Sequence, residues 1–386
     1  MQTPIVRHLS LSSSEQALIA QAERFAQQHL SHVESQQPSR FYRELLVQAC
    51  EAGLAAIEVP ADQGGAGASF AARARVCEVL AQQHAGFAFS LVNHHNVIVR
   101  IARQGNAVAR ERWLATMLSG EQIGCTAMTE PQSGSDFTSM RTVARRDGDG
   151  WILNGAKDWI TNTAYADVFL VYAQTDPDAG ARGIAGFLVD AGTPGFERGE
   201  IHAGFGTEGI GAGAFQLHDV RVGPESLIYS PGDGFLAAMR GVNDARTYVA
   251  AINAAMMDSA LQTACRYTES RQAFGKPLSG IQGVGWPLAT VATHLQALYL
   301  LVDTGIQAIV AQQDAQGIAA MAKKYANEHA GPAIAACMQA MGARGLLPEY
   351  RLDRFLSWAR AFCYTDGTPE MMNERIVHVL RKPYRQ

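Results

Sequence analysis

Hydrophobic and polar residues follow three successive patterns along the chain. From about residue 12 to about 120, apolar side chains recur three and four positions apart, as in SEQALIAQAERFAQQHL, which predicts helices. Between about 124 and 230, short alternating runs separated by Gly, Asp and Pro predict antiparallel strands. These runs are WILNG, DVFLVYAQT, GIAGFLVD and FQLHDVRV. The helical spacing returns from about 232 to 384, where residues 235–272 alone could form one long helix.

The bulk composition excludes several classes of function. With 386 residues the chain is long enough for two or three domains and a large core. Its formal net charge of −4 argues against a nucleic-acid partner, which would need a basic face. No run of about eighteen apolar residues is available to span a membrane, and the first residues lack the apolar segment of a secretory signal. We therefore expect a cytoplasmic protein without a membrane or nucleic-acid partner.

Neither a metal centre nor a Rossmann-type dinucleotide site is expected. The six cysteines contain no C-x-x-C pair, so they indicate reduced core residues, and the adjacent His94 and His95 lack metal-ligand spacing. Residues 204–209 (GFGTEG) fit G-x-G-x-x-G by letter. The alternating run AFQLHDVRV follows them, however, where a dinucleotide fingerprint requires the N-terminus of a helix.

Two short motifs in the strand-rich stretch carry the most chemical information. The first is MTEPQSGSD, residues 128–136, and the second is NGAKDWITN, residues 154–162. Backbone N–H groups and a hydroxyl in a Gly-Ser turn suit a pyrophosphate, a Trp face can lie against a planar ring, and a Thr hydroxyl can meet a ring nitrogen. Lys157, Trp159 and Thr161 stand at alternating positions of a predicted strand. The alternative is an ordinary turn between two polar-edged strands.

These motifs resemble the flavin-binding signature of the acyl-CoA dehydrogenase family, and further matches extend through most of the chain. They are EAGL at 51–54, VPADQGGAG at 59–67, RQAFGKPL at 271–278, QAMGARG at 339–345 and DGTPE at 366–370. The resemblance implies an α+β fold with an N-terminal helical domain (1–123), a middle antiparallel β-domain (124–231) and a C-terminal domain like a four-helix bundle (232–386). It also implies FAD as the cofactor.

The same resemblance assigns site residues. It places Thr129, Ser135, Trp159, Thr161 and Thr368 against the FAD of their own subunit, and Arg271, Phe274 and Gln339 against the FAD of a neighbouring subunit in a homotetramer built from dimers. Gly342 and Glu370 belong to the same cofactor motifs, whereas Ser135, Arg246 and Gly367 would bind the substrate. Judged without the family, Arg271 would be a surface charge at a helix end, Phe274 a core aromatic, and Arg246 half of a helix salt bridge.

The position of the catalytic base is where this chain departs most from its family. Most members have a glutamate before Gly-Thr, but here the residue is Asp366; a minority place their glutamate on a long helix, where this chain has Ala245. Asp366 is therefore the one candidate base that the motifs provide. The shorter side chain withdraws the carboxylate by about 1.5 Å, and a displacement of roughly 1 Å can lower a rate on the order of 10²-fold. The alternative is that Asp366 is only a turn residue.

Other departures indicate an unusual acyl pocket. Thr365 follows Tyr364 where the family often has a tyrosine directly before the base, Glu208 replaces an arginine, Ala343 replaces a glycine, and Glu370 replaces a glutamine. His94, His95 and Asn96 fall on a helix that approaches the acyl chamber in the family. We expect them at a solvent-facing helix end, with contact to a substrate ring or carboxylate as the alternative.

The leading hypothesis is an FAD-dependent acyl-CoA dehydrogenase that acts on a bulky alicyclic or α-branched acyl group, such as cyclohexanecarboxyl-CoA. An electron-transfer flavoprotein would reoxidise it. The alternatives are a flavoprotein oxidase of the nitroalkane type, an acyl-CoA desulfinase, a dehydrogenase of a carrier-protein thioester, and a flavoprotein retained only for binding.

Overall fold

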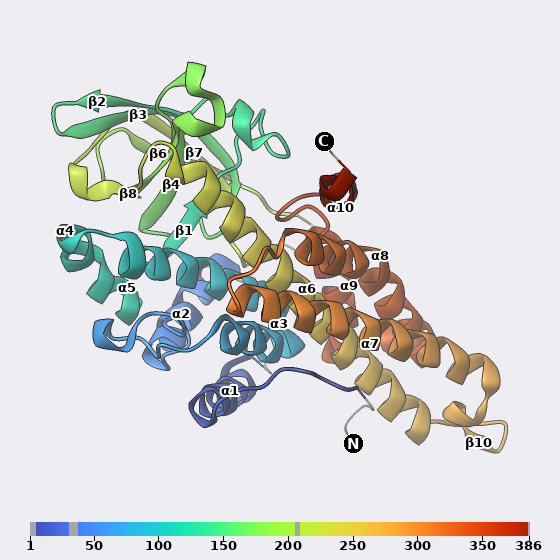
Figure 1. Ribbon diagram of the computed structural model, residues 1–386. Coiled ribbons are helices and arrows are strands. Elements are labelled where there is room, and N and C mark those ends of the chain that lie inside the picture. Colours follow the sequence, from blue (N-terminus) through green and yellow to red (C-terminus); the bar gives the residue numbers. More distant parts are fainter. Residues whose placement is uncertain (1–4, 31–37, 205–208, 385–386) are drawn as a thin grey trace. The chain divides into compact units, whose positions relative to one another are not determined.

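The computed structural model describes residues 5–30, 38–204 and 209–384, and its elements are drawn in Figure 1. Contacts within the chain divide it into two compact units. The sheet unit comprises Ala20–Arg73 and Gly86–Gly241. The helical unit comprises Met1–Ile19, Ala74–Ala85 and Val242–Gln386. Each unit is described by itself below. Within the described residues, no helix is both long enough and apolar enough to cross a membrane.

Helices occupy the N-terminal stretch, as its hydrophobic spacing predicts. They are α1 (Ser13–Phe25), α2 (Pro38–Glu51), α3 (Phe70–Gln104), α4 (Ala107–Ala109) and α5 (Ala115–Ser119). The first begins at a capping box, in which the Ser12 N–H donates to the Glu15 carboxylate (2.9 Å) and the Glu15 N–H donates to Ser12 Oγ (3.3 Å). Helix α3 continues through one non-helical residue, His84.

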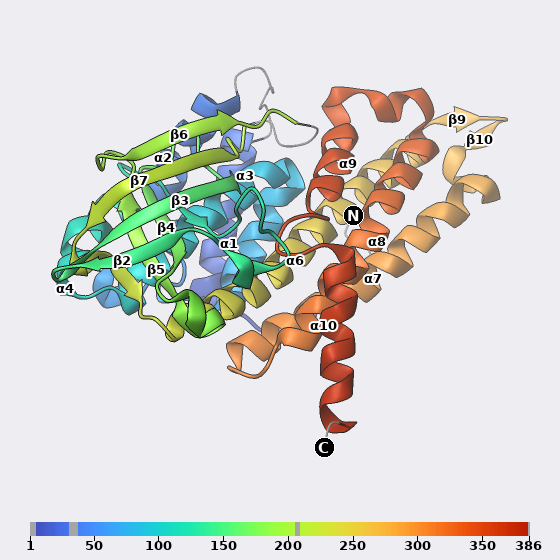
Figure 2. The ribbon, with the colours of Figure 1, turned by 90° about the horizontal axis from the view of Figure 1, so that it is seen from above.

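Strands β1–β8 form one eight-stranded sheet. They are β1 (Gly124–Ala127), β2 (Val143–Asp147), β3 (Gly150–Ile160), β4 (Val168–Gln174), β5 (Ile184–Asp190), β6 (Phe196–Ile201), β7 (Gly213–Val222) and β8 (Leu227–Tyr229). Their order is β6-β7-β3-β2-β4-β5-β8, with β1 beside β4, and Figure 2 shows β6, β7, β3 and β2 side by side. The predicted antiparallel character is confirmed for the pairs β2–β3, β3–β7, β4–β5, β5–β8 and β6–β7, whereas β4 pairs in parallel with both β1 and β2.

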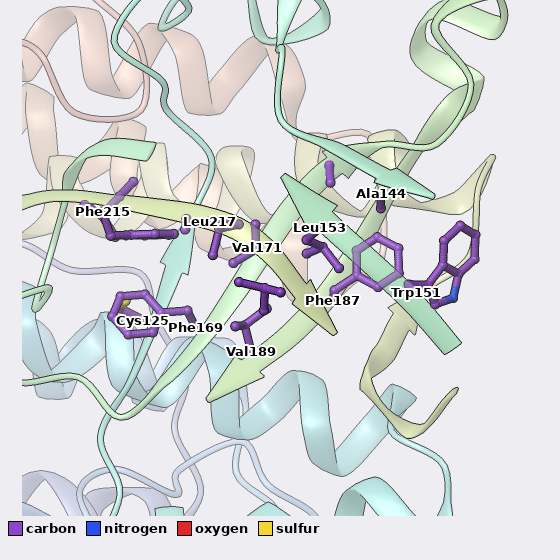
Figure 3. Close-up of a cluster of buried hydrophobic side chains, with 14 of the residues drawn as sticks. Cys125, Ala144, Trp151, Leu153, Phe169, Val171, Phe187, Val189, Phe215 and Leu217 are labelled. Atoms are coloured by element: carbon purple, nitrogen blue, oxygen red, sulfur yellow. The ribbon is translucent and has the colours of Figure 1, made fainter. Parts of the chain in front are cut away.

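One face of this sheet builds a dense apolar core (Figure 3). Alternate residues of β4 and β5 point into it, and the rings of Phe169, Phe196 and Phe215 meet with centroids 4.8–4.9 Å apart. At the other end of the cluster, the indole of Trp151 lies edge-on against Phe187. This core contains residues at the ends of β1 and β3; the first candidate flavin motif follows the end of β1, and the second runs through the second half of β3.

The C-terminal stretch forms the long helices of the helical unit. They are α6 (Asp233–Ser270), α7 (Gln282–Val310), α8 (Gln316–Met341), α9 (Leu352–Ala361) and α10 (Pro369–Arg381), and the two-residue strands β9 (Gln272–Ala273) and β10 (Lys276–Pro277) form a hairpin after α6. The single long helix predicted over residues 235–272 is confirmed over 235–270 as part of α6, whereas Gln272 belongs to β9. Arg7 joins the N-terminal segment to α3 and α7 through ion pairs with Glu78 (2.8 Å) and Asp303 (2.6 Å).

Candidate active site

The first flavin motif leaves the sheet at the end of β1 and is fastened to the end of β3. The Asp158 N–H donates to the Thr129 carbonyl (3.0 Å), which brings Thr129 beside Trp159. Glu130 and Ser133 exchange two backbone hydrogen bonds and thereby close a tight loop. Ser135 lies just beyond this loop on an exposed turn. The structure therefore brings Thr129 of the first motif next to the Asp158–Trp159 segment of the second.

A buried ion pair between Lys157 and Glu130 anchors this loop to β3. Lys157 is 0% exposed, and its Nζ donates to the Glu130 carboxylate (2.9 Å) and to the Met128 carbonyl (3.0 Å). Glu130 also accepts hydrogen bonds from the N–H groups of Arg141 and Thr142. Burial lowers the pKa of Lys157 to about 8 against the raising effect of Glu130. Lys157 thus supports the loop and does not present its amine at the surface.

Trp159 departs from the alternation that the sequence predicted for this strand. The pairing of β3 with β7 shifts register between Lys157 and Ile160, and Trp159 adopts a left-handed backbone (φ 57°). As a result the side chain of Trp159 is exposed (62%) while Lys157 is buried, and Thr161 lies in the turn after the strand. A bulky residue in this conformation is strained, and such strain is concentrated at functional sites.

Two residues that the sequence analysis missed hold Trp159 in this position. The Asp158 carboxylate accepts a hydrogen bond from the Trp159 N–H (2.8 Å) and pairs with His202 Nε2 (2.6 Å). The imidazole of His202 in turn lies against the indole, with ring centroids 4.3 Å apart. Asp158 and His202 are far apart in sequence, so the sequence does not indicate that they pair. The one local indication is that Asp158, a polar residue, directly precedes Trp159.

The helical unit contains Asp366 within a strained turn between α9 and α10. Asp366 (φ 54°) and Gly367 (φ 108°) both adopt positive φ angles, and a Cβ on Gly367 would lie 2.8 Å from Met372 Cε. Arg246 Nε donates to the Asp366 carbonyl (3.0 Å), and Arg246 NH1 donates to Asn243 Oδ1 (3.0 Å). The predicted base and the predicted substrate arginine are therefore in direct contact.

The surroundings of Asp366 shift its ionisation in opposing directions. The residue keeps a partly exposed surface, yet burial of its carboxyl group raises the pKa above the ordinary 3.8, against the lowering effect of Lys323 and Arg246. Burial also lowers the pKa of Arg246 to about 10, against the raising effect of Asp366. A carboxylate with a raised pKa is the better proton acceptor near neutral pH.

The remaining predicted residues of the helical unit lie at element ends. Thr368 is the N-cap of α10, where its hydroxyl accepts from the Met371 N–H (3.4 Å), and Glu370 follows on the exposed first turn. Arg271, Gln339 and Gly342 are exposed at the ends of α6 and α8. Phe274 is 94% exposed on the β9–β10 hairpin, so the alternative of a core aromatic is wrong.

The expected solvent-facing position of His94 and His95 is also wrong. Both are buried in α3, at 0% and 1% exposure. His94 Nδ1 accepts from the Gly124 N–H (2.9 Å), and its Nε2 lies 3.1 Å from the Met117 carbonyl. His95 Nε2 accepts from the Glu58 N–H (3.2 Å). Burial lowers the pKa of both imidazoles, so they are neutral core residues. Glu208, another predicted departure from the family, lies outside the described residues.

Sequence models of all three acyl-CoA dehydrogenase domains match this chain. The N-terminal domain matches residues 12–121, the middle domain residues 125–220 and the C-terminal domain residues 232–380. The mitochondrial short-chain specific acyl-CoA dehydrogenase of Bos taurus is 31% identical over 384 residues, which cover 99% of this chain and 93% of the bovine protein.

Solved structures agree with these matches. Butyryl-CoA dehydrogenase from Megasphaera elsdenii is 27% identical and superposes with a TM-score of 0.91 over 97% of this chain and all of its own. The prolyl acyl carrier protein oxidase AnaB is 25% identical, with a TM-score of 0.88 over 96% of this chain and all of its own. The chain belongs to the acyl-CoA dehydrogenase family. The predicted fold and the predicted class, an FAD-dependent oxidoreductase of this family, are confirmed.

Proposed function

We propose that this enzyme dehydrogenates a bulky, alicyclic or α-branched acyl-CoA thioester between Cα and Cβ, with Asp366 as the base. The observation that carries the proposal is the turn at Asp366, where a carboxyl group with a raised pKa stands on strained backbone held by Arg246. Strain of this kind persists only where surrounding contacts over-determine it, and here those contacts surround the one candidate base that the family motif supplies.

The sheet unit has the features that FAD requires. Trp159 offers an exposed aromatic face that is fixed from behind by His202, and the Gly134–Ser135 turn is open, since a Cβ on Gly134 would meet only Thr129 Cγ2 at 3.9 Å. Thr129, Ser135, Trp159 and Thr161 would hold the cofactor there, and Thr368 would contribute from the helical unit. The hydride that leaves Cβ requires the flavin ring as its acceptor.

The protein's own part in the reaction is proton removal and substrate placement. The Asp366 carboxylate takes the α-proton of the thioester, which becomes more acidic as negative charge develops on the thioester oxygen and is stabilised by hydrogen-bond donors. Ser135, Arg246 and Gly367 would position the substrate. Because aspartate reaches about 1.5 Å less far than glutamate, the reacting carbon must lie closer to the backbone. A ring or branch at Cα is one way to place it there.

An anaerobic titration of the flavin-loaded enzyme tests this proposal. Flavin absorbance is followed while cyclohexanecarboxyl-CoA or butyryl-CoA is added. Bleaching by the ring substrate supports the proposal, whereas bleaching by butyryl-CoA alone makes the enzyme a straight-chain dehydrogenase. If neither ester bleaches the flavin, a carrier-protein thioester becomes the better substrate class, which the likeness to the prolyl acyl carrier protein oxidase would favour. Reoxidation by an electron-transfer flavoprotein rather than by oxygen separates a dehydrogenase from an oxidase.

Replacing Trp159 by Ala should weaken FAD binding about tenfold, because an aromatic stacking contact contributes roughly 0.5–1.5 kcal/mol beyond the area it buries. A titration of the apoprotein with FAD, followed by flavin fluorescence, measures the effect. Trp286→Ala is the matched control, since Trp286 is equally exposed (66%) but lies on α7 outside the flavin motifs. Equal losses in the two variants would contradict the assignment of Trp159.

We further propose that Arg271, Phe274 and Gln339 reach the FAD of a neighbouring subunit in a homotetramer. The extreme exposure of Phe274 supports this, since a large apolar side chain at 94% exposure is costly in water. Removing FAD should then lower both the melting temperature and the oligomer population, because a ligand that binds only the assembled form stabilises it by mass action. Light scattering and thermal melts of the apoprotein measure both. An apoprotein of unchanged size and stability would contradict these contacts.

A further inference from the structure

Lys323 of α8 has no part in the chemistry described so far, although it is one of the largest fully buried side chains in the described residues. A lysine is almost never fully buried unless its ammonium group is paired. Lys323 is 0% exposed, and burial lowers its pKa to about 8, against the raising effect of Asp366. Because burying the charged ammonium group is costly, the groups that it contacts indicate the role of Lys323.

The ammonium group of Lys323 joins both ends of the segment that carries Asp366. Its Nζ donates to the Phe362 carbonyl (2.9 Å) and to the Gly367 carbonyl (3.1 Å). Helix α9 ends at Ala361 and α10 begins at Pro369, so these two carbonyls bracket the connection between them. One side chain from α8 therefore binds both the C-cap residue of α9, Phe362, and Gly367, the residue before the N-cap of α10.

Two cations stabilise adjacent peptide groups of the strained turn. Arg246 from α6 binds the carbonyl of Asp366, and Lys323 from α8 binds the carbonyl of Gly367. Asp366 and Gly367 both have positive φ, a conformation that a non-glycine residue such as Asp366 adopts only under constraint. The donors also add positive charge where Asp366 carries its negative charge.

We propose that Lys323 is a positioning residue for Asp366, which fixes the turn that aims the carboxylate. This inference rests on the proposed function of Asp366 as the base. The other charged or titratable groups that act on the pair are Arg246 from α6 and Cys363 from the connection, and Arg375 of α10 acts on Arg246.

The first test compares Lys323→Met with Lys324→Met in the flavin-loaded enzyme. Lys324 is adjacent, lies on the same helix and pairs with Glu328 at the surface, so its replacement removes the same charge without touching the turn. The rate of anaerobic flavin reduction is measured across pH with an acyl-CoA that bleaches the wild type.

For Lys323→Met we expect a rate on the order of 10²-fold lower near neutral pH, as for a base displaced by about 1 Å. Loss of the cation also removes an influence that lowers the pKa of Asp366, so the acid limb of the profile should move to higher pH and the rate should recover partly in alkaline solution. Lys324→Met should keep the wild-type profile. A uniform loss at every pH, or an unchanged profile, would overturn the proposal.

A second measurement needs neither a folded Lys323 variant nor a substrate. The free energy of unfolding of the wild type and of Asp366→Asn is determined from about pH 7 to pH 10. Lys323 loses its proton at about pH 8 in the folded state but near 10.4 in the unfolded state, so its contribution to stability rises with pH in that interval. Without the Asp366 charge this rise should begin at lower pH.

The two stability curves separate this inference from the proposed function. Parallel curves would mean that Lys323 and Asp366 do not interact, which overturns the inference whatever the substrate is. If the curves diverge but no acyl-CoA reduces the flavin, the interaction between Lys323 and Asp366 is supported and the proposed reaction is rejected.

Discussion

Asp366→Asn is expected to lower the rate of flavin reduction by the acyl-CoA substrate about 10²- to 10⁴-fold, the usual contribution of a general base. Asparagine has nearly the same shape as aspartate and tolerates positive φ well, so the turn at φ 54° should persist. FAD content and substrate affinity should therefore stay close to wild type. Anaerobic stopped-flow absorbance measures the reductive step alone. A variant that retains the wild-type rate would place the base elsewhere.

The pH dependence of the same step gives an independent check. Because burial raises the pKa of Asp366 above 3.8, the wild-type rate should rise with pH through that raised value, as the carboxyl group loses its proton. The residual rate of Asp366→Asn should lack this limb, since an amide does not titrate. The free thioester does not ionise in this range, so a limb that persists in the variant would belong to another protein group.

Asp366→Glu is the informative companion variant. The added methylene carries the carboxylate about 1.5 Å farther from the backbone. If the pocket is built for a reacting carbon close to the turn, the glutamate should slow the ring substrate and improve the relative rate with butyryl-CoA. Equal changes for both substrates would mean that the aspartate does not select the acyl group.

The sequence predicted the elements of this fold better than their pairing. Local sequence is enough to locate the strands at β3, β4, β5 and β7 and the long helix α6, because short apolar runs bounded by turn residues, and the helical spacing of apolar residues, are properties of neighbouring residues. The predicted alternation does not hold for β4 and β5, which are buried along almost their whole length. The parallel pairing of β4 with β1 and β2 cannot be predicted in this way. It depends on the path of the loops that bring these strands together, and local periodicity contains no information about that path.

The candidate site shows the same limit at the level of single residues. Thr129 and Trp159 could be found because the family motif contains them. The alternation that placed Lys157 and Trp159 on one face failed at a register shift, which a strand pattern cannot foretell. His94 and His95 were misjudged because the polar atoms that satisfy them come from other segments, such as the Gly124 and Glu58 N–H groups. The role of Lys323 could not be predicted for the same reason, since the carbonyls that it binds belong to Phe362 and Gly367.

Lys157→Met is expected to lower the free energy of unfolding by about 3–5 kcal/mol, the usual cost of leaving one partner of a buried ion pair uncompensated. The Glu130 carboxylate would stay buried at 3% exposure, with the backbone N–H groups of Arg141 and Thr142 and the side-chain amide of Gln132 as uncharged donors. Since Glu130 begins the loop that leads to Ser135, FAD content should fall as well. Denaturant unfolding and the flavin-to-protein absorbance ratio measure the two effects. Lys382→Met, which removes an exposed lysine outside the flavin motifs, is the control.

The double variant Lys157→Met with Glu130→Gln distinguishes a charge effect from a packing effect. Burial alone would raise the pKa of Glu130, but Lys157 and the N–H donors lower it below 4.5, so the pair contributes stability above that pH that is lost as the carboxylate gains a proton in acid. Neutralising both partners leaves no buried charge, and the double variant should be more stable than Lys157→Met alone near neutral pH. If it is less stable by the sum of the single changes, the two side chains act independently and the loop is held by packing instead.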